Sequence, residues 1–188
     1  MSDINLGDLG PLAALVGTWE GARGSDTAPD EPDRLQTAVS RFHERTSFEP
    51  IGLADNHDQL MYGLRYSTMA WRIGENKSFH EEVGYWLWEP ATRSVMKCFN
   101  IPRGISVIAG GTIEPGAGSF TMKAERGSTT FGILGNPYLE REFQMLSFEV
   151  TVTLDGDSYS YEEDTVLKIV GRDQLFHHTD ENTLVRVY

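Results

Sequence analysis

The sequence has a single cysteine and no long apolar run. One cysteine, Cys98, cannot form an intrachain disulfide or a thiolate metal cage. Because it lies between Lys97 and Phe99 in an apolar segment, we expect a buried thiol rather than a nucleophile. The apolar run at residues 12–16 is too short for a secretory signal, and no stretch approaches the roughly 18 apolar residues of a membrane-spanning helix. These absences predict a cytoplasmic protein.

Basic residues are also scarce. The chain has 16 Lys and Arg against 28 Asp and Glu, which gives a net charge of -12. A surface this negative repels phosphate backbones and anionic membranes, so nucleic acid and membranes are poor partners. The remaining class of partner is a small-molecule ligand, and a homodimer is left open.

Helical patterns are few, whereas strand-like segments follow one another along the chain. With 188 residues, 39% of them hydrophobic, the chain suits a single domain over residues 1–188. After a helical turn at residues 9–15, ten segments alternate or are rich in β-branched residues, as strands are. They are residues 16–22, 40–48, 60–71, 79–89, 94–101, 104–114, 119–125, 143–154, 159–170 and 182–188.

The connections between these segments are polar and rich in turn residues. Residues 24–34 and 52–59 are expected as loops, and residues 135–140 as one turn of helix. The pattern predicts an all-β, ten-stranded antiparallel up-and-down barrel like those of lipocalins and fatty-acid-binding proteins, because closure removes exposed sheet edges. Pattern alone also allows a β-sandwich.

The common catalytic motifs are absent, since the chain has no GxSxG, P-loop, GxGxxG or HExxH. The five histidines are His43, His57, His80, His177 and His178. On a strand, His80 and Glu81 face opposite sides and together make no zinc site. The acidic runs at residues 81–82 and 162–164 are expected on solvated faces.

The pair His177–His178 is the most informative of these histidines. Neutral imidazole is a good iron ligand. Adjacent histidines on a strand point opposite ways, so at most one enters a barrel unless a bulge intervenes. From these residues alone, two solvent-facing or edge histidines are the simpler interpretation.

Four short motifs occur in order along nearly the whole chain. GTWEG at residues 17–21 is similar to a GxWxGxG signature, and FHEEVGY at residues 79–85 to a segment of apolar residue, His, x, Glu, x, Gly, Tyr. The third motif is PRG at residues 102–104 with Gly110 soon after. The fourth is a histidine a few residues before a Leu and a basic residue in the last strand. The ordered set resembles the nitrobindins, a calycin-like family of haem-binding β-barrels related to fatty-acid-binding proteins.

The resemblance implies a barrel that holds haem b in a shallow pocket and binds nitric oxide on the ferric iron. It also implies a peroxynitrite isomerase activity, forming nitrate, if haem is bound. His178 is then the metal ligand, with His177 as the alternative. Trp19 is expected to be buried in the signature strand. The cofactor-binding residues that the resemblance carries over are His178, His177, His80, Phe79, Gly17, Trp19 and Gly21.

The chain departs from the family pattern at several positions. Arg23 replaces the third glycine of the signature, residues 52–59 look like an insertion, and acidic residues 162–164 stand where the family tends to have apolar pocket residues. An ungapped alignment on Leu184 places Thr179 at the axial position. A one-residue bulge brings His178 there, and a shift that keeps the alternation brings His177.

Two other functions fit the same scaffold. One is a non-haem barrel that binds a fatty acid or another small apolar ligand. The other is a protein that acts through its surface, with the barrel interior filled by side chains.

Overall fold

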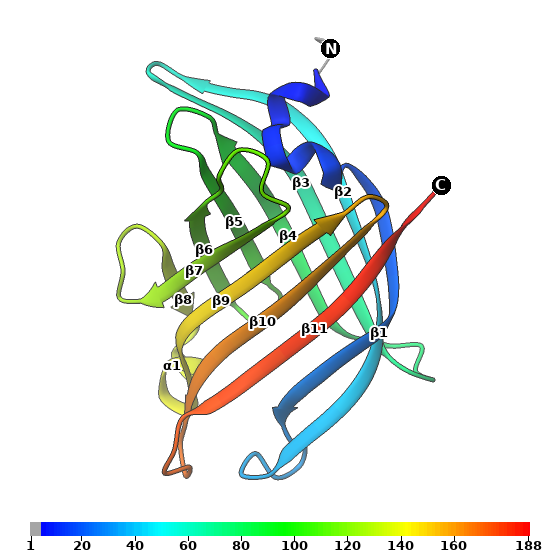
Figure 1. Cartoon of the computed structure of the whole chain (residues 1–188). Coiled ribbons are helices and arrows are strands. Elements are labelled where there is room, and N and C mark those ends of the chain that lie inside the picture. Colours follow the sequence, from blue (N-terminus) through cyan, green and yellow to red (C-terminus); the bar gives the residue numbers. More distant parts are fainter. Residues whose placement is uncertain (1–4) are drawn as a thin grey trace.

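The computed structural model describes residues 5–188 and shows one closed β-barrel (Figure 1). A 3-10 helix, η1 (Leu6–Leu15), precedes the strands, and a short helix, α1 (Pro137–Glu142), lies between β8 and β9. The strands are β1 (Gly17–Pro29), β2 (Thr37–Asn56), β3 (Gln59–Arg72), β4 (Ser78–Glu89), β5 (Ser94–Ile101), β6 (Ile105–Thr112), β7 (Ser119–Arg126), β8 (Gly132–Gly135), β9 (Phe143–Asp155), β10 (Ser158–Ile169) and β11 (Phe176–Val187). Within residues 5–188, neither helix has the length and apolar character needed to cross a membrane.

Most neighbouring strands are antiparallel and follow chain order, and β11 closes the barrel against β1. The exception is β8, which is inserted between β6 and β7 and runs parallel to β7. The predicted all-β barrel with a short N-terminal helical turn is confirmed. Residues 5–188 form eleven strands rather than ten, because β8 has only four residues and its pattern is too short to be recognised in sequence.

Two segments that were expected as polar loops instead continue the strands. β1 extends through residues 24–29, where Ser25, Asp26 and Thr27 pair with both β2 and β11. β2 extends to Asn56 and pairs with the start of β3, so residues 52–59 form a hairpin. The loop prediction is confirmed for residues 30–34 but was wrong for residues 24–29 and 52–56, because polar composition does not exclude a strand whose side chains alternate between two faces.

Two element boundaries also differ from the sequence prediction. The helical turn expected at residues 135–140 is α1, which starts at Pro137 because the Asn136 side chain accepts hydrogen bonds from the N–H groups of Tyr138 and Leu139. The last strand begins at Phe176 rather than at residue 182. Both histidines of the pair therefore lie within a regular strand.

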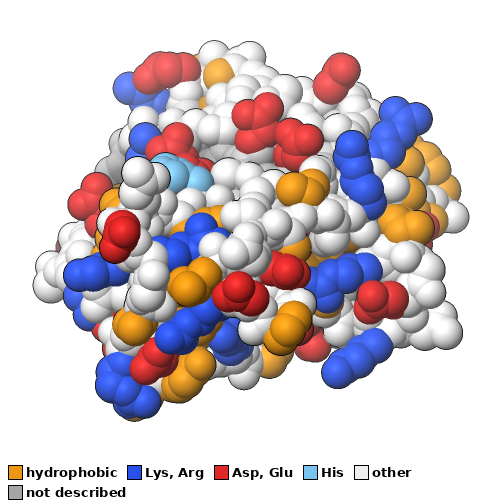
Figure 2. Space-filling model, turned by 90° about the horizontal axis from the view of Figure 1, so that it is seen from below, with side chains coloured by type: hydrophobic (Ala, Val, Ile, Leu, Met, Phe, Trp, Pro, Cys, Tyr) orange, Lys and Arg blue, Asp and Glu red, His pale blue; other side chains and the backbone are white. Residues whose placement is uncertain are grey.

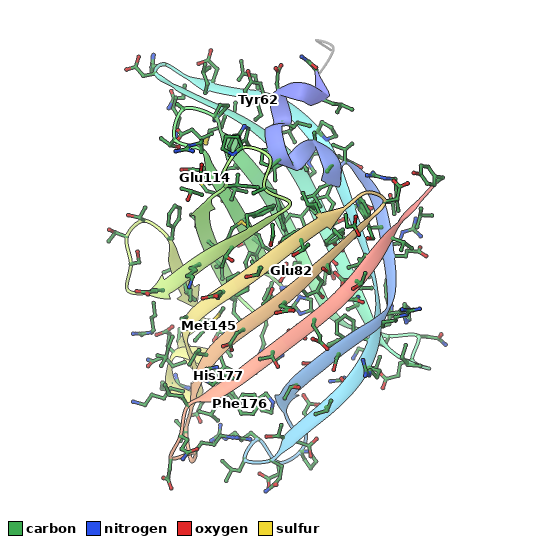
Figure 3. All side chains as sticks on the ribbon, in the orientation of Figure 1. Tyr62, Glu82, Glu114, Met145, Phe176 and His177 are labelled. Atoms are coloured by element: carbon green, nitrogen blue, oxygen red, sulfur yellow. The ribbon has the colours of Figure 1, made fainter. Side chains whose placement is uncertain are left out.

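The barrel end next to η1 has an apolar interior. Leu9, Leu12 and Leu15 of η1 are fully buried there. Trp19 is 1% exposed, which confirms its predicted burial, and its indole N–H donates to the Leu15 carbonyl at 2.7 Å. Its ring meets the ring of Tyr159 edge-on, with centroids 5.2 Å apart. Phe176 and His177 lie toward the opposite end, which we call the far end (Figure 3).

Candidate functional site

The inner surface of the far end carries polar and charged side chains. On β11 the side chains alternate, so His178 and Asp180 face inward while His177 and Thr179 face outward. The pairing of β11 with β10 runs without a register shift from Phe176 to Val185. Register shifts do occur nearby, in β1 and in the pairing of β9 with β10, but not between β10 and β11. Plain alternation therefore puts His178 on the inner face.

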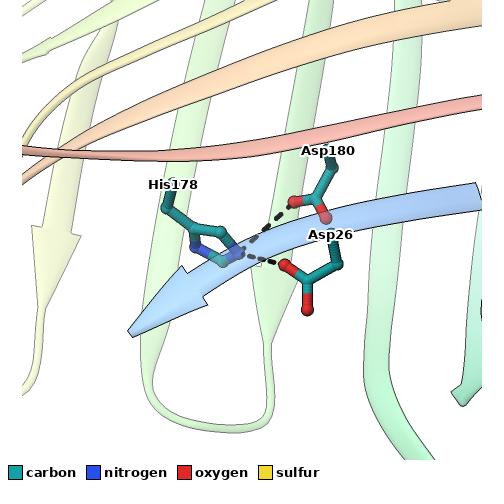
Figure 4. Close-up of side chains that lie close together, drawn as sticks. All are labelled: Asp26, His178 and Asp180. Carbon is teal, nitrogen blue, oxygen red and sulfur yellow. Dashed lines mark hydrogen bonds and ion pairs between the residues drawn. The ribbon is translucent and has the colours of Figure 1, made fainter. Parts of the chain in front are cut away.

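His178 is held between two carboxylates, in a group that we call the Asp26 cluster (Figure 4). Its Nε2 lies 3.0 Å from Asp26 Oδ1 and 3.5 Å from Asp180 Oδ2. The Asp26 side chain is only 3% exposed and also accepts a hydrogen bond from the Ser40 hydroxyl at 3.2 Å. The His178 side chain is 33% exposed, so the cluster is reachable from solvent.

The charges of the Asp26 cluster depend on one another. Burial disfavours the imidazolium of His178, but the hydrogen bond to Asp26 and the charge of Asp180 outweigh burial and raise the pKa of His178. Burial together with the negative charges of Glu163 and Asp26 raises the pKa of Asp180 to about 7, against the opposing effect of His178. Burial also acts on Asp26, but its bonds to His178 and Ser40 lower the pKa of Asp26. The cluster therefore favours an ionised Asp26 beside a protonated His178, whereas Asp180 is partly protonated near neutral pH.

A second group, the Glu82 cluster, consists of His80, Glu82, Lys97, Glu163 and Tyr66. Glu82 is 5% exposed and lies at its centre. Its carboxylate contacts Lys97 Nζ at 3.0 Å and His80 Nε2 at 3.3 Å, and accepts the Tyr66 hydroxyl at 2.7 Å. Lys97 Nζ also lies 3.6 Å from Glu163. Buried charges of both signs therefore compensate one another inside the barrel.

The Glu82 cluster favours the charged forms of Glu82, His80 and Lys97. Burial opposes the charge on Glu82, but Lys97 and His80 lower the pKa of Glu82. Burial likewise opposes the charge on His80, but the hydrogen bond and charge of Glu82 outweigh it and raise the pKa of His80 to about 9. Glu163 acts on both His80 and His178, which indicates that the two clusters adjoin.

Glu44 of β2 is the centre of a third group of polar side chains inside the barrel. It is buried, and its oxygens accept hydrogen bonds from Tyr161 at 2.8 Å, Asn182 at 3.0 Å and Thr68 at 2.8 Å. Thr46 also donates to it at 3.0 Å. Neutral donors surround Glu44, in contrast to the cationic partners of Glu82.

The structure brings some of the predicted site residues together and separates others. His80 and His178 both face the interior. His177 faces outward, is 60% exposed in its side chain and contacts Asp164 at 2.7 Å on the outer surface. Phe79 packs edge-on against the buried Phe42 with ring centroids 5.8 Å apart.

The signature residues of β1 lie nearer to η1. Trp19 belongs to the apolar core described above. Gly21 is required by close packing, since a Cβ there would lie 2.7 Å from the Thr183 carbonyl oxygen. Gly17 has a φ of +126°, which favours glycine. The structure shows no contact between these three residues and His178, and their role toward a cofactor stays a prediction.

Several residues of the site were not identified from sequence. Asp26, Glu44 and Lys97 were missed, and the acidic runs were expected on solvated faces. That expectation is wrong for Glu82 and Glu163, whose side chains are 5% and 15% exposed and face inward. Strict alternation along β4 and β10 was the available signal, because it sends every second acidic residue inside.

Cys98 also differs from its expectation. It is half-buried rather than buried, because Val95, Lys97 and Phe99 take the inner face of β5. Burial still raises the pKa of its thiol, which does not favour a nucleophile.

The view onto the far end shows acidic, basic and apolar side chains mixed over the surface, with a histidine beside carboxylates (Figure 2).

Comparison with known proteins agrees with this architecture. The crystal structure of Rv2717c from M. tuberculosis superposes with a TM-score of 0.66 over 94% of this chain and 95% of that chain, at 21% sequence identity. At this identity the likeness shows the fold. Residues 8–186 match the family model described as the THAP4-like, heme-binding beta-barrel domain. The match spans nearly the whole chain, and the chain therefore belongs to the THAP4-like, heme-binding β-barrel domain family, that of the nitrobindins.

Proposed function

We propose that this barrel binds haem b at its far end, with His178 as the axial ligand. The observation that carries the proposal is that alternation along β11 turns His178 inward and His177 outward. The imidazole of His178 is partly exposed, so a ligand can approach it from solvent. Membership of a heme-binding family supports haem as the ligand of the barrel.

The residue types present suit a haem site, but one side chain, that of His178, must move before it can coordinate iron. An imidazole is the proximal ligand of many haem proteins, and it coordinates iron in the neutral form. Here Nε2 of His178 faces Asp26 and Asp180, so coordination requires that this nitrogen leave the two carboxylates. The aromatic rings of Phe42, Phe79 and Phe176 supply apolar surface in the same part of the barrel.

When bound, haem would supply an iron with an open coordination position for nitric oxide. We propose that the same iron would support the isomerisation of peroxynitrite to nitrate. The chain contributes the environment of that reaction. His80 is charged at neutral pH and held by Glu82 at 3.3 Å, so it offers a fixed hydrogen-bond donor to an anionic ligand. Lys97 keeps Glu82 ionised and thereby keeps His80 in place.

A haemin titration tests the proposal. The wild type is expected to develop a Soret band at one haem per chain, and His178→Ala is expected to lose it. His177→Ala is the matched control, because it removes the adjacent imidazole from the outer face. No specific Soret shift in the wild type, or loss of the band in His177→Ala alone, would contradict the assignment of His178.

The alternative of a fatty-acid barrel receives less support from the interior. An alkyl chain along the axis would lie against Glu44, Glu82 and Lys97, which are all buried in the wall. Placing apolar chain against such charges gains little, because each charge keeps its own polar partners. The observation does not favour that function over haem binding.

We further propose a cytoplasmic location, for which the single unpaired Cys98 is the support, since free thiols persist in reducing compartments.

A homodimer is a separate proposal. Light scattering on the purified chain tests it directly, because a monomer of 21.0 kDa and a dimer of twice that mass are readily distinguished.

A further inference from the structure

We propose that Asp26, His178 and Asp180 bind a divalent transition-metal ion, such as Zn²⁺, when the barrel holds no haem. The inference goes beyond haem binding and does not rest on it. One imidazole nitrogen and two carboxylate oxygens form a mixed N,O ligand set, which suits Zn²⁺, Fe²⁺ or Mn²⁺ better than the all-oxygen sites of Mg²⁺ and Ca²⁺.

The backbone positions these ligands without any rearrangement of strands. Asp26 and Asp180 are direct partners in the pairing of β1 with β11, and both face inward. His178 lies two residues before Asp180 on the same face of β11. Like charges directly opposite one another across a strand pair are destabilising unless a cation lies between them. The register of the barrel therefore creates a place for positive charge.

The distances match a coordination shell. Metal–ligand bonds of about 2.0–2.2 Å put neighbouring ligand atoms about 3.0–3.5 Å apart in tetrahedral or octahedral geometry. Nε2 of His178 lies 3.0 Å from Asp26 and 3.5 Å from Asp180, and all three ligand atoms lie within 4.8 Å of one another (Figure 4). Small side-chain rotations suffice to centre an ion among them.

The imidazole alone does not satisfy both carboxylates. A protonated His178 has one hydrogen on Nε2, and that hydrogen serves one acceptor well, the nearer Asp26. Asp180 Oδ2 lies farther from the same nitrogen, at 3.5 Å, and directly across the strand pair from Asp26. Lys97, the nearest buried amine, is already shared between Glu82 and Glu163. A divalent ion, unlike a proton, bonds to all three side chains at once, and their ligand atoms lie close enough together for this.

The site is open enough to load and leaves room for further ligands. The side chains of His178 and Asp180 are 33% and 23% exposed, whereas that of Asp26 is 3% exposed. Three protein ligands leave at least one position of a Zn²⁺ ion for water or for a small anion. Since the metal and haem both require Nε2 of His178, the two occupants exclude each other.

The test uses the full chain, free of haem and treated with a chelator. Calorimetric titration with Zn²⁺ is expected to give one site per chain, and Co²⁺ is expected to give visible absorption bands that Zn²⁺ removes. Asp180→Asn, Asp26→Asn and His178→Gln are each expected to weaken Zn²⁺ binding about 10–100-fold or more. The matched controls are His177→Gln and Asp164→Asn, which remove the contacting pair on the outer face of β11 and its neighbour β10.

The outcomes separate the metal site from its alternatives. Zn²⁺ binding that is absent, or that survives Asp180→Asn, or that falls equally in the outer-face controls, overturns the proposal. Circular dichroism in chelator identifies a variant that fails to fold. If the buried Asp26→Asn does so, the more exposed Asp180→Asn decides. Asp180→Asn is expected to lose Zn²⁺ but keep haemin binding, so failure of haem binding in the wild type leaves the metal result unaffected.

Discussion

The two ends of the barrel interior share one backbone pattern but differ in their side chains, which are apolar near η1 and largely charged toward the far end. Near η1, the inward positions of the strands hold Trp19, Phe48, Trp86, Phe120 and Tyr159. Toward the far end, beside buried rings such as those of Phe42 and Phe176, the inward positions of the strands also hold ionisable groups. These are Asp26, Glu44, His80, Glu82, Lys97, Glu163, His178 and Asp180.

The difference separates what folds the barrel from what gives it a site. Apolar burial and the ring contacts near η1 supply stability in proportion to area removed from water. The charges of the far end contribute little net stability, because the desolvation of each ion offsets its attraction to its partners. A barrel that needed only stability would gain more from apolar residues at those positions. Their presence marks the far end as the functional end.

The largest loss of stability is expected from truncating a side chain of the apolar core near η1. Trp19→Ala removes a ring that is 1% exposed, together with its hydrogen bond to Leu15. The free energy of unfolding is expected to fall by about 3–5 kcal/mol, measured by urea denaturation. Trp71→Ala is the control, because that ring stacks on His43 and is half-buried. Equal losses in the two variants would contradict the division of the barrel.

The next effect comes from the ions of the far end. Lys97→Met leaves Glu82 and Glu163 without their shared cation. Removing one partner of a buried ion pair typically costs about 3–5 kcal/mol, and we expect the lower limit because Tyr66 and His80 still contact Glu82. Lys123→Met is the matched control, since its pair with Glu149 lies on the surface and is expected to contribute less than about 1 kcal/mol. A similar loss of unfolding free energy in both variants would show that burial does not strengthen the ion pairs of the Glu82 cluster.

The barrel could be predicted from the sequence because its signals are local. Alternation defines β9 over residues 143–154, and the structure ends that strand at Asp155. The failure at residues 24–34 has a specific cause. Asp26 is a charged residue that faces into the barrel, so its type indicated solvent while its position was inside.

The site could be predicted only in part, because its contacts are between distant residues. His178 and Asp26 are 152 residues apart in sequence, and only the register of β1 against β11 makes them neighbours. Lys97 looks like a surface residue until Glu82 and Glu163 are known to face it. His80 and His178 were named through the family resemblance, and their cofactor roles stay predictions.

A smaller effect is expected from pH. The folded-state pKa of His80, about 9, lies above its ordinary value of 6.5. A raised pKa means that the stabilisation is fully present below pH 6.5 and is lost as pH rises through about 9. Thermal unfolding of the wild type is therefore expected to shift to lower temperature between pH 6.5 and 9.5. His80→Gln removes the titrating group that faces Glu82, Glu163 and Asp180, and its unfolding temperature is expected to change less over that range. Parallel curves would exclude His80 as the source.

The smallest effect is expected on the outer face of β11, where the contrast between inside and outside is sharpest. His177 and His178 are adjacent, and each contacts an aspartate, yet Asp164 is 40% exposed whereas Asp26 is 3% exposed. Asp164→Asn is expected to change the free energy of unfolding by less than about 1 kcal/mol, because solvent screens an exposed pair. Asp26→Asn leaves the imidazolium of His178 without its nearer, buried carboxylate and is expected to cost about 1–3 kcal/mol. Urea denaturation in the presence of a chelator measures both variants without a contribution from bound metal. If Asp164→Asn cost as much as Asp26→Asn, burial would not distinguish the two histidines, and the assignment of the inner one to the site would lose its physical basis.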